Sequence, residues 1–291
     1  MTEDGNKTIC AVIISYEPDE TLVRLYDSVK KQADEIVIID NASHSEKSKK
    51  ILFGLSGKTK VIFNEQNYGI AKALNQGALY AIENNYRWLL TLDQDSEFIH
   101  GTYNLLLKAY EGLADKEKTV LIAPAYIEKI DIETNVTFSL PAIEQIKWKD
   151  KTLVITSGSL IKTEAFASVG FFEEKLFIDK VDLDFCFKLR KNGFKCKTAE
   201  NINFMHEIGK PVYKLFFKIA NLSAQRRYYS SKNAVYMLKT YFGYAPFSMA
   251  FLLLKSSVLL APLKILLFEK QKYVKIKNIY KGLIDGLLNR Y

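Results

Sequence analysis

The chain has few of the residues that build disulfide frameworks and metal clusters. Its 291 residues include three cysteines, six prolines and three histidines. Cys10, Cys186 and Cys196 lack the spacing of metal-binding or redox pairs, and Cys10 and Cys186 lie within apolar patterns. We therefore expect all three to be reduced core thiols in a cytosolic protein.

Long hydrophobic runs are also absent. The apolar stretches 247–254 and 258–263 are interrupted by Lys255, Pro262 and Lys264. A membrane-spanning helix needs about 20 mostly apolar residues, so we expect none. No signal peptide is visible at the N-terminus, which gives no indication of a secretory route.

Two common phosphate-binding motifs are missing as well. Residues 54–59 resemble a P-loop, but the first glycine of G-x-x-x-x-G-K-T would fall at Leu52. No G-x-G-x-x-G opens a helix after a strand. Most of the net charge of +8 lies in the apolar tail from Lys255 onward, without a groove-reading motif. This distribution argues against a nucleic-acid-binding module.

What the chain does contain is an alternation of strands and helices. Residues 9–16 form a strand-like run, a helical pattern follows through Val29 and Gln32, and 35–41 form a second strand. This spacing predicts a βαβ unit with parallel strands and a right-handed crossover. Further along the chain we expect a strand at 61–63, a helix at 70–84 and a strand at 88–92. A hydrophobic content of 48% allows one large domain with an appendage.

Polar side chains follow each of these strands. Asp93 and Asp95 are two residues apart at the end of a buried strand, so their side chains point to the same side. Two such carboxylates repel unless a metal or a hydrogen-bond network offsets them. Residues 15–16, 40–41 and 64–69 also fall at carboxyl ends, where open α/β sheets bind ligands. An isolated D-x-D is more often a solvated turn, but here several polar segments share one edge.

Five segments, taken in order, resemble family 2 of the inverting nucleotide-sugar glycosyltransferases. They are 15–18, 40–43, 67–77, 93–96 and 179–186. The resemblance implies a GT-A fold, an α/β architecture with a Rossmann-like, mostly parallel central sheet flanked by helices. It also implies a nucleotide-sugar-binding and catalytic domain at 1–210 and a C-terminal helical region at 211–291. The segments 67–77 and 93–96 look most like the rhamnosyltransferase branch, whose donors are dTDP sugars.

The resemblance assigns the donor site. Asp40 is similar to the acid that accepts a hydrogen bond from the imino N–H of uracil or thymine, which cytosine lacks. The alternative for Asp40 is an Asx turn that only ends the strand. Ser15, Tyr16 and Glu17 would form the rest of the nucleoside pocket. The other donor-binding residues implied are Asn41, Asn67, Gly69, Lys72, Asp93 and Gln94.

The resemblance also implies a divalent metal. Asp93 would contact the ribose and the metal, and Asp95 would ligate the metal directly. A hard cation, Mg²⁺ or Mn²⁺, suits carboxylate and diphosphate oxygens and neutralises the leaving group. His206 matches a histidine that completes the metal site in many relatives, although a lone histidine after an apolar run is more often structural.

The acceptor side comes from the second half of the chain. We expect a strand over 153–161 interrupted by small residues, with Ser157 and Gly158 bordering the sugar and acceptor. On a predicted helix at 181–190, Asp182 aligns with the base that removes the proton of the acceptor hydroxyl. Val181 stands where an acid often precedes this base, so Asp179 and Asp184 remain alternatives. Asp184 is assigned to acceptor binding, or to favourable placement near a helix N-terminus.

Two basic segments of the tail have more than one interpretation. Residues 226–229 and 232–233 are similar to a branch motif, and would hold phosphate or form a solvated basic face. Apolar residues between Ile276 and Leu288 recur at helical spacing, flanked by Lys275, Lys277 and Lys281. Such a helix suits an anionic membrane surface, or it packs on the catalytic domain or another subunit in a homo-oligomer.

Together these features predict a metal-dependent inverting glycosyltransferase. We expect it to move L-rhamnose from dTDP-L-rhamnose to a lipid-linked intermediate of a bacterial cell-surface polysaccharide, in the cytoplasm at the inner face of the membrane. One alternative is a UDP-hexose-dependent enzyme of the same fold. Another is a non-catalytic protein that binds nucleotide sugars or glycans. No nucleic-acid partner is expected.

Overall fold

The computed structural model describes residues 7–128, 139–206, 212–214, 217–219, 222–244 and 255–290. For residues 127–128, 205–206, 212–214 and 217–219 it describes the backbone alone. The chain divides into two compact units. Unit 1 comprises Met1–Phe172 and Phe185–Glu207, and unit 2 comprises Glu173–Asp184 and Ile208–Tyr291. The segment 173–184 thus groups with the C-terminal residues, whereas the sequence places it in the catalytic domain.

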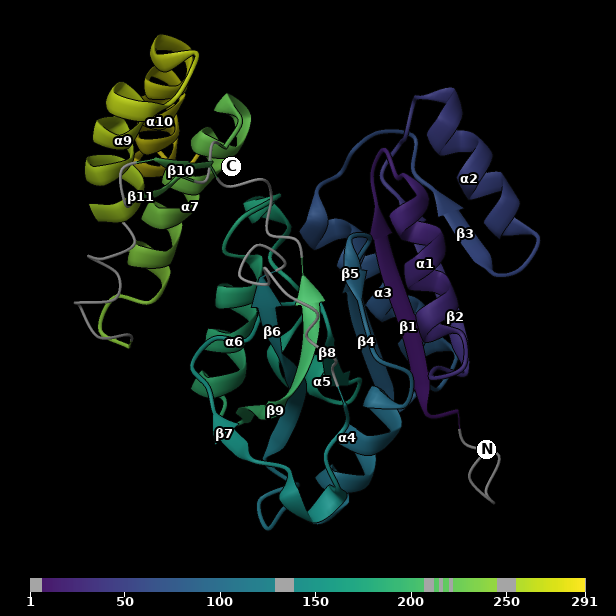
Figure 1. Ribbon diagram of the computed structural model, residues 1–291. Coiled ribbons are helices and arrows are strands. Elements are labelled where there is room, and N and C mark those ends of the chain that lie inside the picture. The colour runs from purple at the N-terminus through teal and green to yellow at the C-terminus, as the bar shows by residue number, and fades with distance from the viewer. Residues whose placement is uncertain are drawn as a thin grey trace. The chain divides into compact units, whose positions relative to one another are not determined.

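Unit 1 is built on a mixed sheet whose first half is parallel (Figure 1). Its strands run in the order β3 (Lys60–Phe63), β2 (Glu35–Asp40), β1 (Ile9–Ser15) and β4 (Trp88–Asp93). Every residue of β1 is buried, as is expected of a strand covered on both faces. The predicted βαβ arrangement is confirmed.

The second half of the sheet is mixed. The antiparallel strand β8 (Ser159–Lys162) joins β4 to β6 (Thr119–Glu128), and β9 (Lys195–His206) runs parallel to β6. The short strands β5 (Ser96–Glu97) and β7 (Trp148–Asp150) pair antiparallel with β9.

The strand predicted over 153–161 begins only at Ser159. Residues 157–158 form a turn instead, in which the Gly158 N–H donates to the Thr91 carbonyl oxygen at 2.8 Å. Gly158 has a φ of +83°, and a Cβ there would lie 3.1 to 3.2 Å from the rings of Phe98 and Phe204. Both the backbone conformation and the close rings therefore require glycine at this turn.

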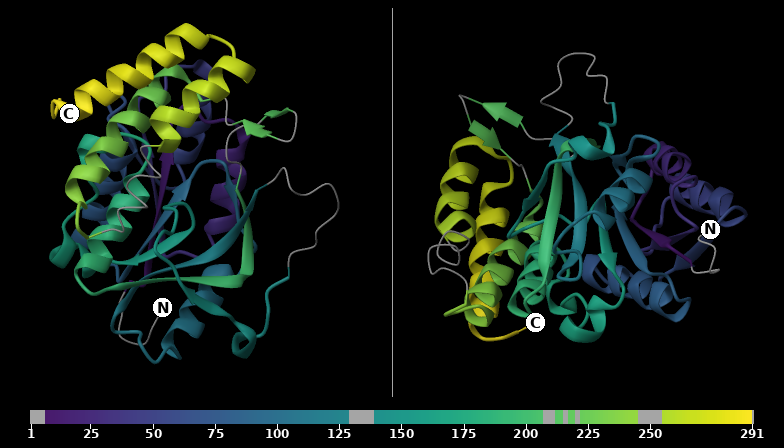
Figure 2. Two further views of the ribbon diagram at one scale, coloured as in Figure 1. Left: turned by 90° about the vertical axis from the view of Figure 1, so that its left-hand side faces the viewer. Right: turned by 90° about the horizontal axis from the view of Figure 1, so that it is seen from below.

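Helices cover both faces of the parallel strands (Figures 1 and 2). Ala11 and Ile13 of β1 belong to one apolar cluster with Leu22 of α1 (Glu20–Val29) and Leu52 of α2 (Glu46–Ser56). Val12 points to the other face, toward α3 (Ile70–Glu83). The remaining helical segments of unit 1 are α4 (Thr102–Glu111), η2 (Ile143–Gln145), α5 (Ala165–Val169) and most of α6 (Val181–Lys191). The three cysteines are buried and free, as predicted, and burial raises the pKa of Cys10 to about 12.

Unit 2 is mainly helical. Its elements are η3 (Glu174–Leu176), β10 (Val212–Lys214), β11 (Phe217–Ile219), α7 (Ala224–Thr240), the π-helical turn η4 (Lys255–Leu260), α9 (Ala261–Phe268) and α10 (Lys272–Leu287). Helices α7 and α10 pack closely because Gly282 and Gly286 face α7. A Cβ at Gly282 would lie 2.2 Å from the Tyr228 carbonyl oxygen. In the described part of the chain, no helix is long and apolar enough to cross a membrane. The apolar stretch 247–254 lies outside the described residues.

The predicted amphipathic helix is present as α10, and only part of its apolar face is buried. Ile279 and the two glycines are buried, together with Lys275, whose ammonium lies 2.7 Å from the buried Glu269 carboxylate. Arg227 pairs with the other Glu269 oxygen at 2.5 Å. Tyr280, Ile284, Leu287 and Leu288 are all about half exposed, at 48 to 56%. Ile279, the two glycines and a paired charge therefore form the contact, whereas several larger apolar side chains of the same helix stay half exposed.

Gly77 provides a test of the helix packing in unit 1. A Cβ at Gly77 would lie 2.3 Å from Val12 Cγ1, so Gly77→Ala forces β1 and α3 apart. We expect it to lower the free energy of unfolding by about 1 to 2 kcal/mol, because overpacking outweighs the gain in helix propensity. The matched control is Gly54→Ala in α2, where no atom lies within 4 Å of the added Cβ.

Gly54→Ala should raise the free energy of unfolding by about 0.5 to 1 kcal/mol. Urea denaturation of the two variants checks both signs. Equal stabilisation by the two alanines would show that α3 does not pack against β1 in this way.

Candidate active site

The predicted donor-site residues of unit 1 meet at one edge of the sheet. Ser15 pairs in register with Asp40, and Ile14 pairs with Asp93, so β1, β2 and β4 end side by side. The Asn41 N–H donates to the Ser15 carbonyl at 2.8 Å, and the Asn64 N–H donates to the Asp40 carbonyl at 2.9 Å. The residues that follow these strands are therefore held in the same order as the strands themselves.

Asp40 closes the turn after β2. It is 2% exposed, and its carboxylate accepts hydrogen bonds from the Ser43 N–H, at 3.0 Å, and from the Ser43 hydroxyl. Ala42 takes a φ of +64° inside this turn. The Asx turn that the sequence offered as an alternative is thus present. A carboxylate has about four lone-pair directions, so Asp40 keeps the capacity to accept a further donor.

Glu17 ties the loop after β1 to the loop after β2. Its carboxylate accepts from the backbone N–H of His44 at 2.6 Å and of Ser45 at 3.2 Å, and its own N–H donates to the Ser43 hydroxyl at 2.8 Å. Hydrogen bonds from Ser45 and from the His44 N–H lower the pKa of Glu17 to about 2. Glu17 therefore stays ionised over the whole range in which enzymes are assayed.

Gln94 ties the loop after β1 to the loop after β4. Its Oε1 accepts from the Tyr16 N–H at 2.9 Å and from the Ser15 hydroxyl at 3.1 Å, and its Nε2 donates to the Tyr16 carbonyl at 3.1 Å. On the other side of the same turn, the buried Ser157 hydroxyl accepts from the Asp93 N–H at 3.0 Å and lies 2.7 Å from the Ser96 hydroxyl. These contacts fix the turn in which Asp93 is half-buried and Asp95 is exposed.

An amide network fixes the start of α3. Asn41 donates to the Gly69 carbonyl at 3.1 Å, Asn64 donates to Asn41 at 2.9 Å, and Gln76 donates to Asn64 at 2.8 Å. The Asn67 side chain accepts from the Gly69 N–H at 2.9 Å. Gly69, with a φ of +85°, leads the backbone directly into the helix N-terminus, an arrangement that favours anions. Lys72 lies in the first turn, with its ammonium 5.4 Å from the centre of the Tyr68 ring.

Strand pairing brings together the two chain segments that carry the predicted metal ligands. Ser96 pairs with His206 across β5 and β9, which places the turn carrying Asp93 and Asp95 beside the end of β9. The His206 side chain itself is outside the described residues. Among the side chains that are described, no three His, Cys, Asp or Glu groups lie close enough to hold a metal ion by themselves.

Asp182 and Asp184 belong to unit 2, at the start of α6. Asp182 is half-buried, its Oδ1 accepts from the Leu183 N–H at 2.8 Å, and burial raises its pKa. Asp184 is fully buried and accepts from the Tyr241 hydroxyl at 2.7 Å. Asp179 pairs with Arg226 at 3.0 Å. Asp184 and Asp179 thus each have a partner on or beside α7, and the catalytic assignment of Asp182 stays a prediction.

Several residues of this edge were not predicted as site residues from the sequence. Ser43, Asn64 and Gln76 hold the polar turns in place, and each does so through a partner at least three residues away. Ser45 offered a signal, since a serine followed by a helical pattern is a common N-cap, and its hydroxyl accepts from the Ser48 N–H at the start of α2. The partners of Asn64 and Gln76 depend on the tertiary fold and left no such signal.

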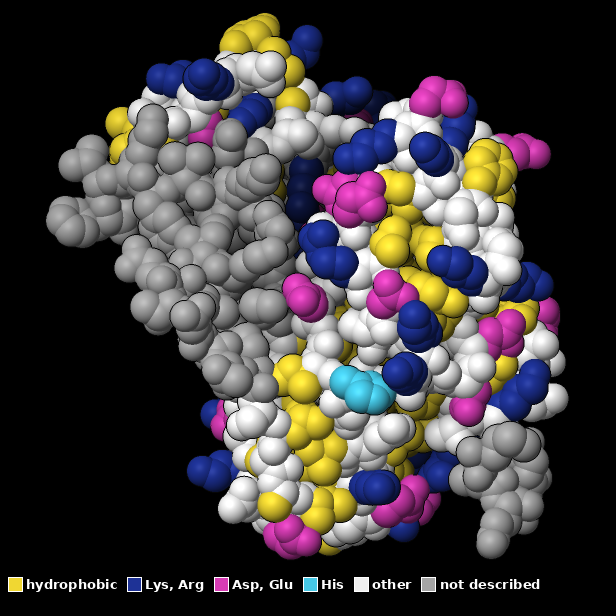
Figure 3. Space-filling model, turned by 45° about the vertical axis from the view of Figure 1, so that its right-hand side comes forward, with side chains coloured by type: hydrophobic (Ala, Val, Ile, Leu, Met, Phe, Trp, Pro, Cys, Tyr) yellow, Lys and Arg dark blue, Asp and Glu magenta, His cyan; other side chains and the backbone are white. Residues whose placement is uncertain are grey.

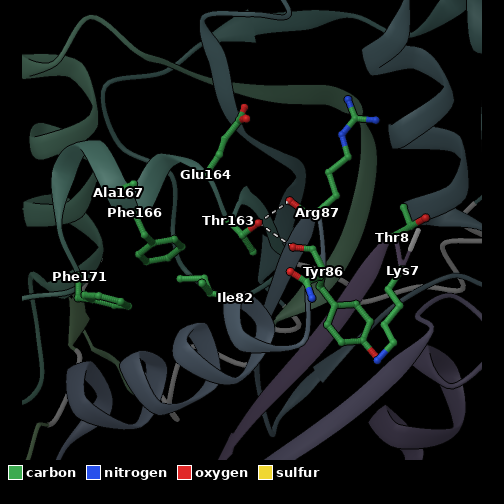
Figure 4. A pocket seen from close by; sticks show the side chains of 11 residues that line it. Lys7, Thr8, Ile82, Tyr86, Arg87, Thr163, Glu164, Phe166, Ala167 and Phe171 are labelled. Carbon is green, nitrogen blue, oxygen red and sulfur yellow. Dashed lines mark hydrogen bonds between the residues drawn. The ribbon is translucent and has the colours of Figure 1, made fainter. Parts of the chain in front are cut away.

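A cavity of about 770 Å³ lies at the opposite edge of the same sheet (Figure 4). It is lined by residues that precede β1 and β4, among them Lys7, Thr8 and Arg87, and by Thr163, whose hydroxyl donates to the Tyr86 carbonyl at 2.6 Å. Because it lies at the amino ends of the strands, it is distinct from the predicted donor site.

On the face shown in Figure 3, basic and acidic side chains are interspersed, unlike the single-sign patch typical of nucleic-acid binding.

Comparison with known proteins identifies the family. The model for "Glycosyl transferase family 2" matches residues 10–169, which include the ends of β1, β2 and β4. The chain belongs to glycosyltransferase family 2. It is 28% identical over 248 residues to the dTDP-rhamnosyl transferase RfbF of Shigella flexneri, covering 80% of this chain and 81% of that protein. The enzyme is thus a rhamnosyltransferase-like glycosyltransferase, as the sequence predicts.

Solved structures confirm the GT-A fold. S. aureus TarS 1–349 in complex with UDP-GlcNAc matches with a TM-score of 0.58 and 15% identity, over 97% of this chain and 82% of that one. GalNAc-T7 with UDP, GalNAc and Mn²⁺ matches with a TM-score of 0.55 and 17% identity, over 88% of this chain and 55% of that one. At 15 to 17% identity, the similarity to these two structures establishes the fold of this chain and does not identify its substrates.

Proposed function

We propose that this glycosyltransferase moves L-rhamnose from dTDP-L-rhamnose to a hydroxyl of a lipid-linked glycan, with inversion at the anomeric carbon. The assignment of the donor rests on the similarity to a dTDP-rhamnosyl transferase over 80% of the chain. The Asp40 turn supports a pyrimidine with an imino N–H, because a carboxylate accepts that hydrogen and rejects cytosine.

Ser15, Tyr16, Glu17 and Asn41 complete the nucleoside pocket in this proposal. Asn67, Gly69 and Lys72 bring the N-terminus of α3 and a cation to the diphosphate, which suits its negative charge. Gln94 sets the direction of the turn that carries the two aspartates. The preformed hydrogen bonds of this edge mean that the donor binds to groups already in place.

Asp93, Asp95 and His206 would hold Mg²⁺ or Mn²⁺ together with the diphosphate. The donor set fits, since a small divalent ion often takes one or two carboxylates and completes its shell with phosphate oxygens and water. When bound, the ion offsets the charge that develops on the departing diphosphate.

Asp182 removes the proton of the acceptor hydroxyl as that oxygen attacks the anomeric carbon from the face opposite the diphosphate. Burial raises the pKa of Asp182, which makes it a stronger base than an exposed aspartate. Ser157, Gly158 and Asp184 border the acceptor. Because Ser157 and Asp184 are buried and already hydrogen-bonded, we expect them to shape the acceptor site more than to contact the acceptor.

Nucleotide release tests the donor and the metal. We expect release from dTDP-L-rhamnose, stimulated by a short lipid-linked glycan and abolished by a chelator, because the diphosphate leaves poorly without the divalent ion. The measurement is a panel of thymidine- and uridine-diphosphate sugars with added Mg²⁺ or Mn²⁺. Release from a uridine-diphosphate sugar alone would keep the family and overturn the rhamnose assignment, in favour of a donor like the one bound to TarS.

Asp182→Asn tests the base. Removal of the carboxylate should lower kcat by about 100-fold or more while donor affinity changes less than about twofold, since general-base help is typically worth 10²- to 10⁴-fold. In the wild type, transfer should fall as the pH drops through the raised pKa of Asp182, and therefore above the usual aspartate range near pH 4. Unchanged transfer by Asp182→Asn would eliminate Asp182 as the base.

We further propose that unit 2 contacts an anionic membrane surface, where a lipid-linked acceptor is presented. Five leucines around α9 are each 41 to 71% exposed. They are Leu259, Leu260, Leu263, Leu266 and Leu267. Exposed lysines flank them at positions 255, 264, 270 and 272. Exposed leucines beside lysines are typical of helices that lie in the interface of anionic bilayers.

Vesicle flotation tests this contact. Binding to vesicles that contain phosphatidylglycerol should exceed binding to phosphatidylcholine vesicles, and Leu263→Ser with Leu267→Ser should reduce it by about tenfold or more, since each inserted leucine contributes over 1 kcal/mol. The matched control replaces two exposed apolar residues of unit 1, with Leu79→Ser and Ile143→Ser. Equal loss from both pairs, or equal binding by all proteins, would exclude α9 as the contact.

A further inference from the structure

The turn before the proposed base has a backbone that its side chains disfavour. Phe177, Asp179 and Lys180 have φ values of +57°, +65° and +65°. At Phe177 the chain makes a γ-turn, in which the Ile178 N–H donates to the Leu176 carbonyl at 2.6 Å, with ψ at −62°. Positive φ is uncommon outside glycine and asparagine, and a bulky residue adopts it only when its surroundings hold it there.

This turn determines where the proposed base lies. Its last carbonyl, that of Lys180, accepts the first hydrogen bond of α6 from the Asp184 N–H at 2.9 Å. Asp182 is in that first helical turn. If the turn 177–180 relaxed to ordinary φ values, the first turn of α6 would change direction and Asp182 would move with it.

Asn233 of α7 holds the turn from one side. Its side chain is fully buried, and its Nδ2 lies within hydrogen-bond distance of three carbonyl oxygens of the turn, those of Leu176 (2.7 Å), Ile178 (2.8 Å) and Asp179 (2.9 Å). Its Oδ1 is buried and accepts no hydrogen bond from the residues that the structure describes. The amide is thus used as a donor to the turn, at the cost of an unsatisfied acceptor.

Three other residues of α7 support the same turn. Arg226 pairs with Asp179 at 3.0 Å, the Tyr229 ring stacks on Phe177 with 4.7 Å between ring centres, and the Ser230 carbonyl accepts from the Lys180 ammonium at 2.8 Å. Every residue with a positive φ in the turn therefore has a partner on one face of α7. Of these partners, Asn233 alone is fully buried and bonds only to backbone.

We propose that Asn233 is a positioning residue for transfer: it holds the turn 177–180 in its strained backbone conformation and thereby fixes Asp182 in the first turn of α6. This inference rests on the proposed function, in which Asp182 is the base. It assigns part of the basic segment 226–233 to support of the catalytic turn, in place of phosphate binding or a solvated face.

Asn233→Ala tests the proposal. We expect kcat to fall at least tenfold and the donor KM to stay within twofold, because the donor-site residues lie in unit 1. The acid limb of the pH profile of kcat, where transfer falls at low pH, should also move to lower pH. The reason is that Asp182 loses the burial that raises its pKa. The charged groups that accompany Asp182 are Asp179 and Lys180 on the turn and Arg226 on α7. A smaller folded fraction lowers kcat, and acid unfolding of a destabilised variant would move this limb to higher pH, opposite to the expected shift.

Ser231→Ala is the matched control on the same helix. Ser231 is also fully buried, and its hydroxyl donates to the Ile279 carbonyl of α10 at 2.8 Å without touching the turn. It should lower Tm and leave kcat and the acid limb at wild-type values. All assays are run at a temperature at which circular dichroism shows each variant folded. If Asn233→Ala does not fold, Tyr229→Leu is tested in its place. We expect it to lower kcat about threefold and to move the acid limb in the same direction.

Three results would overturn or separate the assignments. Suppose that Asp182→Asn abolishes transfer. If the folded Asn233→Ala protein then has wild-type kcat and a wild-type acid limb, the positioning role alone is overturned. Tyr229→Leu serves for this comparison if Asn233→Ala does not fold. Wild-type transfer by Asp182→Asn would remove the base assignment and this inference with it. An acid limb that shifts equally in Ser231→Ala would reduce Asn233 to a general packing role and overturn the proposal.

Discussion

The parallel register of β1, β2 and β4 is the constraint on which the candidate site depends. Parallel strands end at the same edge, so residues separated by up to 79 positions, such as Ser15 and Gln94, become hydrogen-bond partners. A register shift of one residue would turn Asp40 and Asp93 to the opposite face of the sheet, because successive side chains of a strand alternate between faces. The buried apolar side chains of β1 prevent such a shift, since they would have to exchange α1 for α3 as their contact.

The polar turns at this edge then hold one another. Glu17 bonds to the loop after β2, Gln94 bonds to the loop after β1, and Asn41 bonds to the start of α3. Each neutral hydrogen bond contributes only about 1 kcal/mol net, but a buried polar group without a partner costs about 1 to 3 kcal/mol. The edge is therefore stable only in the arrangement that satisfies its members together. A nucleotide sugar that binds there meets oriented groups and pays little for ordering them.

Much of this arrangement could be predicted because local patterns determine it. Apolar runs gave the strands of the parallel half, and their ends gave the polar edge. The errors came where tertiary contacts decide. Gly158 leaves the strand because the rings of Phe98 and Phe204 approach it, and neither ring is near it in sequence. The burial of Lys275 on α10 was not foreseen, because it depends on pairing with Glu269, whereas an unpaired lysine would stay in solvent.

The turn 177–180 was the hardest feature to foresee, since no glycine marks its positive φ values. Positive φ costs roughly 1 to 2 kcal/mol per non-glycine residue, so the three residues together cost several kcal/mol. The bonds from Asn233 and the contacts of Arg226, Tyr229 and Ser230 offset a cost of that size if each contributes about 1 kcal/mol. A turn with glycines would avoid the cost and would also be free to move. The strained turn is rigid because its side chains permit few alternatives once α7 is in place, which is the property a base needs to meet an attacking hydroxyl at one fixed position.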